Sequence, residues 1–391
     1  MVDIRTPSDE LAGDNMQREK LRDLELPLYK LGKRLHINPP SVGIQSSCHV
    51  NESQNDLDML LLAQWEDRAS QGLLKYDVTA CETKIIPGSF GFIAQLNELE
   101  EWHLKKQPAE LQANQVLQPF DPSKFNFTKV GQCELLFSIK MSEDENCELI
   151  PKASVKTDDN LVIMNIHPIE YGHVLLVPRA LCCLPQMIDI NSFELVIEMA
   201  AAVNNCFFRI GYNSLGAFAT VNHLHFQAYY LANPLPVEVA CTQLIPGDWQ
   251  RSGLKIFELV DYPVKGLLFE IGQNLGQMAE VVATLCCSLQ NINTPFNILI
   301  SDCGTRIFLF PQCYADKRAR GMIEENFLQT KVNPSVWEIG GHIVFNRNLD
   351  YSHATEQFVR DFLAVASLNH EEFEGLKFLC TGIAERICCQ Y

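Results

Sequence analysis

The order of hydrophobic and polar residues along the chain predicts short strands, separated by turns, with a helix among them. Apolar and β-branched runs indicate strands within residues 85–96, 133–139, 161–166, 174–177 and 224–230. Between the last two, residues 192–203 predict a helix, because Phe193, Val196, Met199, Ala200 and Val203 recur at intervals of three and four. One side of this helix is therefore expected to pack on an antiparallel sheet.

The same order of elements begins again after Pro234-Leu-Pro236. Strands are predicted at 254–259, 296–301 and 306–311, and a helix at 278–289, just after Gly276. Two amphipathic segments, 355–368 and 371–389, close the chain and are expected to be structural helices. The pattern thus predicts a second structural unit that repeats the strand-helix-strand order of the first.

The N-terminal part differs in character. Residues 1–55 are polar, and Pro39-Pro40 would interrupt a helix, so an irregular arm is expected, docked in part near residues 26–29. Residues 56–68 predict a packing helix with Asp56 as its N-cap and Leu57, Leu60, Leu61 and Trp65 on one side. We therefore divide the chain into an arm (1–55), a first half (56–235) and a second half (236–391), with an α+β fold.

Composition adds three limits. The 391 residues are 47% hydrophobic, enough for one large core or two smaller ones. The net charge of −17 argues against a nucleic-acid partner, which requires a basic face, so local cations must hold any anionic substrate. A signal-like apolar run and a membrane-length run are both lacking in the sequence, so no membrane partner and a cytosolic location are expected.

The fifteen cysteines are spread along the chain and include three adjacent pairs but no Cys-x-x-Cys. In a cytosolic protein such residues are expected to be reduced and mostly buried thiols. The lack of Cys-x-x-Cys removes the strongest sequence signal for structural zinc, so no metal is predicted.

Residues 221–227 carry the candidate chemistry, because His223, His225 and Gln227 occupy alternate positions and would share one face of a strand. A neutral imidazole, whose ordinary pKa is about 6.5, is a competent nucleophile toward phosphorus near neutral pH. In an isolated His-x-His, the alternative is that the two side chains are simply exposed to solvent or bind a metal ion. Upstream, Gly211, Asn213 and Gly216 predict a turn-rich loop over residues 209–220, where backbone can approach a ligand closely.

Two motifs carry a resemblance. The segment 165–178 contains Asn165, His167-Pro168 and Gly172-His-Val-Leu-Leu-Val-Pro178, and His-x-His-x-Gln follows about fifty residues later. Together they resemble the transferase branch of the histidine-triad superfamily, in which Gln replaces the third His. Residues 75–84, 125–131, 223–231, 298–304 and 308–313 further resemble the plant GDP-L-galactose phosphorylase family, which is related to animal GDP-D-glucose phosphorylases. The resemblance spans about Leu26 to Leu368.

This resemblance implies a histidine-triad-like antiparallel sheet with crossing helices in two halves, as in galactose-1-phosphate uridylyltransferases, the second half being degenerate. It also implies that His225 attacks the α-phosphorus of a GDP-hexose to form guanylyl-histidine, which inorganic phosphate converts to GDP in L-ascorbate synthesis. Gln227 would donate to a phosphoryl oxygen and favour transfer over hydrolysis, and His223 would orient His225. GDP-L-galactose and GDP-D-glucose both remain candidate donors.

Further residues are assigned by matching the family motif. Thr220 and Asn213 match phosphate-side groups and Asn165 a ribose contact, whereas His173 and Pro178 are expected to shape the strands. The candidate cations are Lys84, Lys124, Lys129 and Arg179, of which Lys84 and Lys129 lie in family-like segments. The zinc-binding cysteines of distant uridylyltransferases are missing, so no cofactor is expected and His223 is free to orient the nucleophile. A homodimer and a nuclear pool beside the cytosolic one are also expected from relatives.

The sequence departs from the family over residues 98–107, where Glu98-Leu-Glu-Glu-Trp-His-Leu-Lys-Lys-Gln replaces a segment with more arginine. Two other functions therefore stay open. One is a histidine-triad nucleotide hydrolase, which Gln227 and the duplicated length disfavour. The other is a non-catalytic, nucleotide-binding regulatory relative, which the altered segment alone would favour.

Overall fold

The computed structural model describes Glu19, residues 21–32, 55–97 and 115–142, Asp144, and residues 146–271 and 274–389; the altered segment 98–107 lies outside these residues. The large sheet takes seven strands from the first part of the chain: β1 (Glu25–Leu31), β4 (Leu135–Met141), β5 (Glu148–Ser154), β6 (Asn160–Met164), β7 (Val174–Val177), β8 (Phe208–Asn213) and β9 (Phe226–Tyr230). It takes five from the second part: β10 (Thr242–Ile245), β11 (Leu254–Leu259), β12 (Leu267–Ile271), β13 (Phe296–Ser301) and β14 (Arg306–Pro311).

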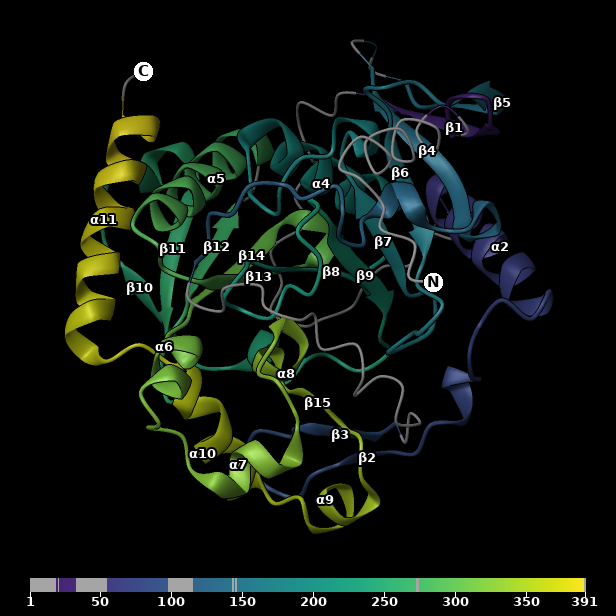
Figure 1. Ribbon diagram of the computed structural model, residues 1–391. Coiled ribbons are helices and arrows are strands. Elements are labelled where there is room, and N and C mark those ends of the chain that lie inside the picture. Colours follow the sequence, from purple (N-terminus) through teal and green to yellow (C-terminus); the bar gives the residue numbers. More distant parts are fainter. Residues whose placement is uncertain are drawn as a thin grey trace.

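These twelve strands form one continuous sheet in the order β10-β11-β12-β14-β13-β8-β9-β7-β6-β4-β1-β5 (Figure 1). All neighbours in it pair antiparallel except β1 and β4. Together with the helices that cover it, this sheet confirms the predicted α+β fold class.

Two units within the sheet have the same layout. In the first, β6 and β7 lead through α4 (Ile190–Val203) to β8 and β9; in the second, β11 and β12 lead through α5 (Leu275–Asn291) to β13 and β14. Strands β8 and β13 pair at the centre, with Asn213 opposite Asn297, and each unit continues outward in the same strand order. Two units with the same order of strands and helix therefore share one sheet.

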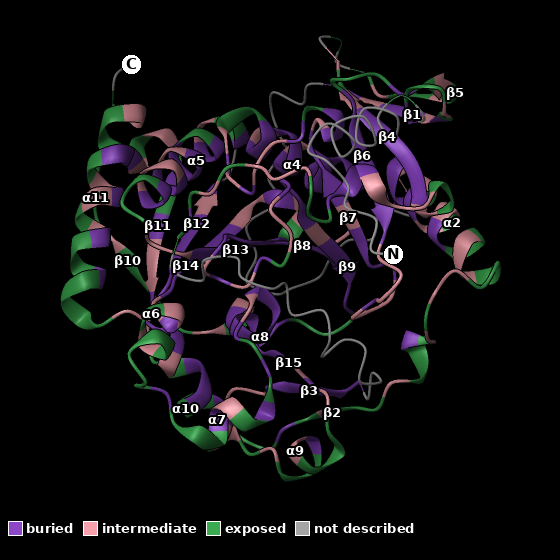
Figure 2. Cartoon of the chain, in the orientation of Figure 1, coloured by how far each residue is buried: buried purple, intermediate pink, exposed green. Residues whose placement is uncertain are grey.

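One face of the sheet is covered by α4, α5, α2 (Asp56–Ser70) and α11 (His370–Cys388) (Figure 1). Sheet residues such as Phe226, Ala228 and Ile298 pack against these helices in a buried cluster. Asp189 is the N-cap of helix α4, and its side chain accepts a hydrogen bond from the backbone N–H of Ser192. The sheet strands are mostly buried, whereas the outer side of α11 is exposed (Figure 2).

The opposite face is covered by residues 83–96 together with the C-terminal part of the chain. A three-stranded sheet of β15 (His342–Phe345), β3 (Ile93–Leu96) and β2 (Thr83–Ile85) lies there with α8 (Val336–Gly340) and α10 (Glu356–Ala366) (Figure 1). Their apolar residues pack with Tyr229, Leu299 and Phe308 of the large sheet in a second buried cluster. The short helices α6 (Tyr314–Ala319), α7 (Glu325–Thr330) and α9 (Asn348–His353) complete the described elements of this layer.

Three predicted elements differ from the structure. Residues 25–31 lie in the expected irregular arm but form β1, because their alternating apolar residues fit between β4 and β5 and a break in register at Leu26/Leu28 accommodates Pro27. The predicted strand 85–96 is instead two strands of the small sheet joined by a turn. Asp56 is the first residue of α2, and Asn55 is the N-cap.

The predicted turn-rich loop 209–220 is wrong at its beginning, because residues 208–213 form the central strand β8. Gly211 has ordinary strand neighbours, and its missing side chain serves packing: a Cβ there would lie 2.7 Å from Cγ1 of Val336 and 2.9 Å from Cζ2 of Trp337. Only Gly216, with φ of +79°, adopts the left-handed conformation expected of a loop glycine.

The cysteines also differ from expectation. Among the described residues, thirteen cysteines are free thiols, and three of them, Cys183, Cys286 and Cys380, are buried, so the prediction of mostly buried thiols is wrong for this part of the chain. Directly adjacent residues point in different directions, so each adjacent pair buries at most one sulfur. Cys206 is disulfide-bonded, whereas the cysteines were expected to be reduced.

Candidate active site

The segment between β8 and β9 positions the two candidate histidines. It turns at Gly216 and Phe218, both with positive φ, and reaches His223 and His225 immediately before β9, where both rings are buried. Along β9, Phe226 and Ala228 point to the helical layer, whereas Tyr229 belongs to the cluster on the opposite face. Gln227, which contacts the side chain of Trp337, shares the face of Tyr229, away from the helices.

The geometry of His225 determines which ring nitrogen is available. Its Nδ1 lies 2.8 Å from the carbonyl oxygen of His223. A carbonyl only accepts, so Nδ1 must carry the proton and Nε2 keeps its lone pair. Burial lowers the pKa of His225 to about 4, although the hydrogen bond with His223 opposes this shift. The ring is therefore neutral near pH 7, with an unprotonated Nε2.

Gln186, which the sequence analysis missed, holds the main chain of His225. Its Oε1 accepts a hydrogen bond from the backbone N–H of His225 at 2.9 Å, and its Nε2 donates to the carbonyl oxygens of His225 at 3.2 Å and Asn213 at 2.9 Å. The side chain is fully buried. An isolated Gln between Pro185 and Met187 has no periodic pattern that would have identified it.

His223 uses its side chain differently from His225. Its Nδ1 accepts a hydrogen bond from the backbone N–H of Phe127 at 3.1 Å, and its ring centroid lies 5.5 Å from that of Phe120 and 5.6 Å from that of Phe127. The Phe127 ring also lies 4.9 Å from the ring of His225. The His223 side chain thus secures the loop that packs on His225, while its main-chain carbonyl contacts the His225 ring directly.

Gln227 contacts residues from both halves. Its Oε1 accepts a hydrogen bond from Nε1 of Trp337 at 3.2 Å. Burial lowers the pKa of His173 to about 3, and a side-chain hydrogen bond with Gln227 opposes that shift. Nδ2 of Asn165 lies 3.2 Å from Nε2 of His173, so Asn165 joins the site through His173.

Asn213 lies at the end of β8, close to the same region. Its Oδ1 accepts hydrogen bonds from Nδ2 of Asn297 at 2.6 Å and from the backbone N–H of Val336 at 2.9 Å. Neither of these two bonds uses its Nδ2 group. Asn213 also ties β8 to β13 and α8.

The other predicted ligands are more dispersed. Thr220 is exposed on the loop before His223. Nζ of Lys129, two residues after Phe127, donates to the carbonyls of Pro122 and, at 2.8 Å, Lys124, which is itself exposed. The guanidinium of Arg179 pairs with Asp189 at 2.6 Å, and Lys84 lies on the small sheet with Nζ 4.3 Å from the ring centroid of Tyr351. The structure therefore gathers His223, His225, Gln227, Asn213 and Asn165 but holds Arg179 and Lys84 in other contacts.

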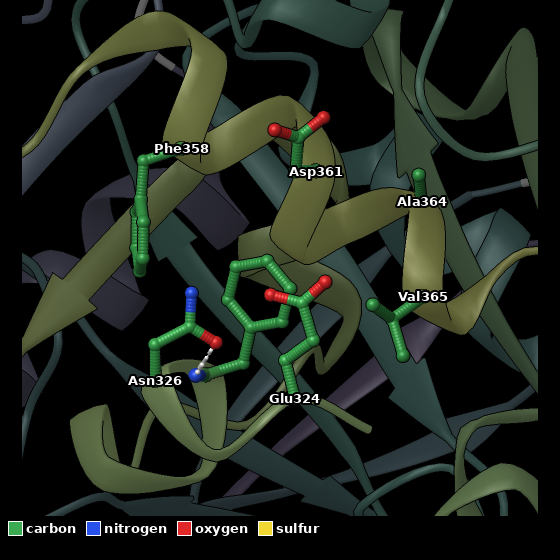
Figure 3. A pocket seen from close by; sticks show the side chains of 7 residues that line it. Glu324, Asn326, Phe358, Asp361, Ala364 and Val365 are labelled. Atoms are coloured by element: carbon green, nitrogen blue, oxygen red, sulfur yellow. Dashed lines mark hydrogen bonds between the residues drawn. The ribbon is translucent and has the colours of Figure 1, made fainter. Parts of the chain in front are cut away.

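A hollow of about 420 Å³ lies elsewhere, beside α7 and α10 (Figure 3). It is lined by Glu324, Asn326, Phe327, Phe358, Asp361, Ala364 and Val365. Its two carboxylates would repel the phosphates of a nucleotide, and none of the candidate site residues lines it. We therefore place the site at His225.

The described residues contain no group of three or more His, Cys, Asp or Glu side chains arranged to hold a metal ion. The helices within the described ranges include none that is long and apolar enough to cross a bilayer.

Two family models cover most of the chain. One, described as the GDPGP1-like N-terminal domain, matches residues 56–229, and the other, the GDPGP1-like C-terminal domain, matches residues 236–387. The chain belongs to the GDPGP1-like family. The family resemblance stated from the motifs is thereby confirmed.

Curated relatives agree with this assignment. GDP-L-galactose phosphorylase 1 of Arabidopsis thaliana is 55% identical over 325 residues, which cover 83% of this chain and 73% of the relative. GDP-D-glucose phosphorylase 1 of Danio rerio is 32% identical over 343 residues, which cover 84% of this chain and 91% of the relative. Among solved structures, yeast Ap4A phosphorylase Apa2 matches with a TM-score of 0.51 and 12% identity, covering 80% of this chain and 95% of that one. At that identity the likeness concerns the fold alone.

Proposed function

We infer that this chain is a GDP-L-galactose phosphorylase: a nucleotidyltransferase that transfers GMP from GDP-L-galactose to inorganic phosphate and yields GDP and L-galactose 1-phosphate. The observation that carries this function is the 55% identity to GDP-L-galactose phosphorylase 1 across 83% of the chain. The 32% identity to GDP-D-glucose phosphorylase 1 makes GDP-D-glucose the second donor to test. The resemblance places the reaction in L-ascorbate synthesis.

In the first step, Nε2 of His225 attacks the α-phosphorus of the donor. A phosphorus–nitrogen bond forms, and the bond from the α-phosphorus to the bridging oxygen breaks, so that hexose 1-phosphate leaves with the electron pair. His225 retains its proton on Nδ1, and the carbonyl of His223, 2.8 Å away, stabilises the positive charge of the guanylylated ring. No general base is needed, because the attacking nitrogen already has a lone pair.

In the second step, an oxygen of inorganic phosphate attacks the α-phosphorus and the phosphorus–nitrogen bond breaks. This releases GDP and returns His225 to its neutral form. Gln227 supports both steps by donating its amide N–H to a nonbridging oxygen of the transferred group. Because an amide is neither an acid nor a base near pH 7, it does not activate water, and the intermediate persists until phosphate arrives.

The surrounding polar residues supply binding contacts in this proposal. Nδ2 of Asn213 faces phosphate, Asn165 contacts the ribose, and Lys129 holds phosphate beside the Phe127 loop. The substrate contacts predicted for Thr220, Lys84 and Arg179 remain predictions. A cytosolic location with a nuclear pool, and a homodimer, also remain predictions.

Product analysis tests the proposed function. Purified protein is incubated with GDP-L-galactose or GDP-D-glucose, with and without inorganic phosphate, and GDP, GMP and hexose 1-phosphate are quantified. We expect GDP in amounts equal to hexose 1-phosphate, only when phosphate is present, with ping-pong kinetics and a higher kcat/KM for GDP-L-galactose. GMP formed without phosphate would instead indicate a nucleotide hydrolase. Nucleotide binding without turnover would indicate a regulatory relative.

A further inference from the structure

The second half carries no His-x-His, yet one of its side chains reaches the candidate active site. We propose that Trp337 is a positioning residue that orients the amide of Gln227 for phosphoryl transfer. This inference rests on the proposed function, since it concerns the same reaction. It assigns the degenerate half a direct part in the chemistry of the first half.

The contact between the two side chains determines the orientation of the amide. Nε1 of Trp337 lies 3.2 Å from Oε1 of Gln227. An indole nitrogen only donates, so the amide atom that faces it must be the oxygen. The NH₂ end of Gln227 is then directed away from Trp337. If the Gln227 amide were rotated so that its oxygen and NH₂ group exchanged places, its oxygen would face the phosphoryl oxygens and repel them.

His173 also contacts the side chain of Gln227. Its Nδ1 accepts a hydrogen bond from the backbone N–H of Ile169 at 2.9 Å. Gln227 forms a side-chain hydrogen bond with this ring. The Gln227 side chain is therefore held from both halves, by His173 in the first and by Trp337 in the second.

Trp337 is itself held firmly in place. Its ring centroid lies 4.0 Å from that of Tyr229, and the neighbouring backbone N–H of Val336 donates to Oδ1 of Asn213 at 2.9 Å. The indole also lies against the bare backbone of Gly211, where a Cβ would come within 2.9 Å of Cζ2. Packing on β8 and β9 thus fixes the direction of the indole N–H.

The test is Trp337→Phe, which removes the donor and keeps an aromatic ring. We expect kcat to fall about tenfold with a smaller change in KM, which is less than the roughly 10²–10³-fold loss from deleting a transition-state donor outright. The matched control is Trp249→Phe. Trp249 is equally buried, and its Nε1 has no hydrogen-bond partner among the described residues, so this change should leave kcat within about twofold of wild type.

A double-mutant cycle distinguishes positioning from a general structural effect. If Trp337 acts through Gln227, Trp337→Phe should cost less than about twofold in kcat when Gln227 is already Ala. An equal loss in both backgrounds, or wild-type kcat in Trp337→Phe, would overturn the proposal. A wild-type protein that yields no GDP from either GDP-hexose would instead refute the proposed function, so the two failures are distinguishable.

Discussion

Nδ1 of His225 lies 2.8 Å from the main-chain carbonyl oxygen of His223. The two histidines of the motif are therefore related through the main chain, and the ring of His223 points to the backbone of Phe127 instead. The carbonyl places the proton of His225 on Nδ1 and leaves Nε2 for attack. In the proposed mechanism, His223 therefore orients the His225 ring through its main-chain carbonyl and not through its side chain.

The first prediction compares the two histidines. His225→Asn should abolish turnover by several orders of magnitude, because the covalent route is lost, while nucleotide binding is largely retained. His223→Asn keeps the carbonyl and supplies an oxygen that can accept the hydrogen bond from Phe127, so its kcat should fall by less than about tenfold. Steady-state GDP formation with both purified variants measures this. Equal losses would show that the His223 side chain takes part in the chemistry.

The second prediction concerns pH. Burial lowers the pKa of His225 to about 4, so the nucleophile stays unprotonated well below pH 6.5. The rate of guanylylation should change little between pH 8 and pH 5. An imidazole with an ordinary pKa of about 6.5 would instead lose about thirtyfold by pH 5.

A single turnover in phosphate-free buffer, quenched and analysed by protein mass, measures this rate, because the diphosphate diester of the donor does not titrate in the range. Circular dichroism at each pH shows that the protein remains folded. An acid limb centred near pH 6.5 would contradict the burial of a neutral His225.

The third prediction concerns Gln186. Gln186→Met removes three buried hydrogen bonds to the main chain at His225 and Asn213, and should lower the free energy of unfolding by about 2–4 kcal/mol. It should also lower kcat per folded molecule by at least about tenfold, since the nucleophile is no longer held in its attack geometry. Urea denaturation and active-site-normalised kinetics provide the two values.

Gln290→Met is the matched control. Gln290 is also buried and bonds the N–H and carbonyl of a single residue, Ile188, at 2.7 and 3.1 Å, but Ile188 carries no site group. This variant should lose stability and keep its kcat. Comparable kcat losses in both variants would mean that Gln186 acts only through stability.

The fourth prediction concerns the connection between the halves. Arg209 on β8 and Glu238, at the start of the second half, form a two-pronged ion pair at 2.8 and 2.9 Å, and both side chains are at most 7% exposed. Glu238→Gln leaves the arginine charge buried without its counter-ion and should lower the free energy of unfolding by about 3–5 kcal/mol. Guanidinium denaturation measures the change.

Asp248→Asn serves as its control, because Asp248 pairs with Arg251 at the surface, where the side chains are 69% and 86% exposed. That change should alter stability by less than about 1 kcal/mol. Similar effects of the two substitutions would show that the Arg209–Glu238 pair does not join the halves energetically.

Periodicity predicted most of the regular structure, because burial on a sheet face or a helix stripe repeats at every second, third or fourth residue. The strands 174–177, 254–259, 296–301 and 306–311 lie where the pattern placed them, and helix α10 begins after Thr355, whose side chain caps it. The strand β8 was missed since Gly211 and Asn213 are also turn residues. There the glycine accommodates Trp337, a contact from 126 positions further along the chain that local sequence cannot indicate.

The candidate site was predicted only where its residues form a local pattern in the sequence. The alternate positions of His225 and Gln227 can be recognised in the sequence itself, and the structure places Gln227 on the face away from the helices. Gln186 and Trp337 approach from distant segments and carry no motif, so only the folded chain reveals them. Lys84 and Arg179 were proposed for their charge, and the fold engages both with other side chains.

The most direct test of the proposed mechanism is the intact mass of the protein after mixing with GDP-L-galactose in phosphate-free buffer, followed by addition of phosphate. We predict an adduct of the mass of GMP on the wild-type protein, its loss as GDP appears when phosphate is added, and no adduct on His225→Asn. An adduct that persists in His225→Asn, or GMP released without phosphate and without any adduct, would contradict a guanylyl-histidine at position 225.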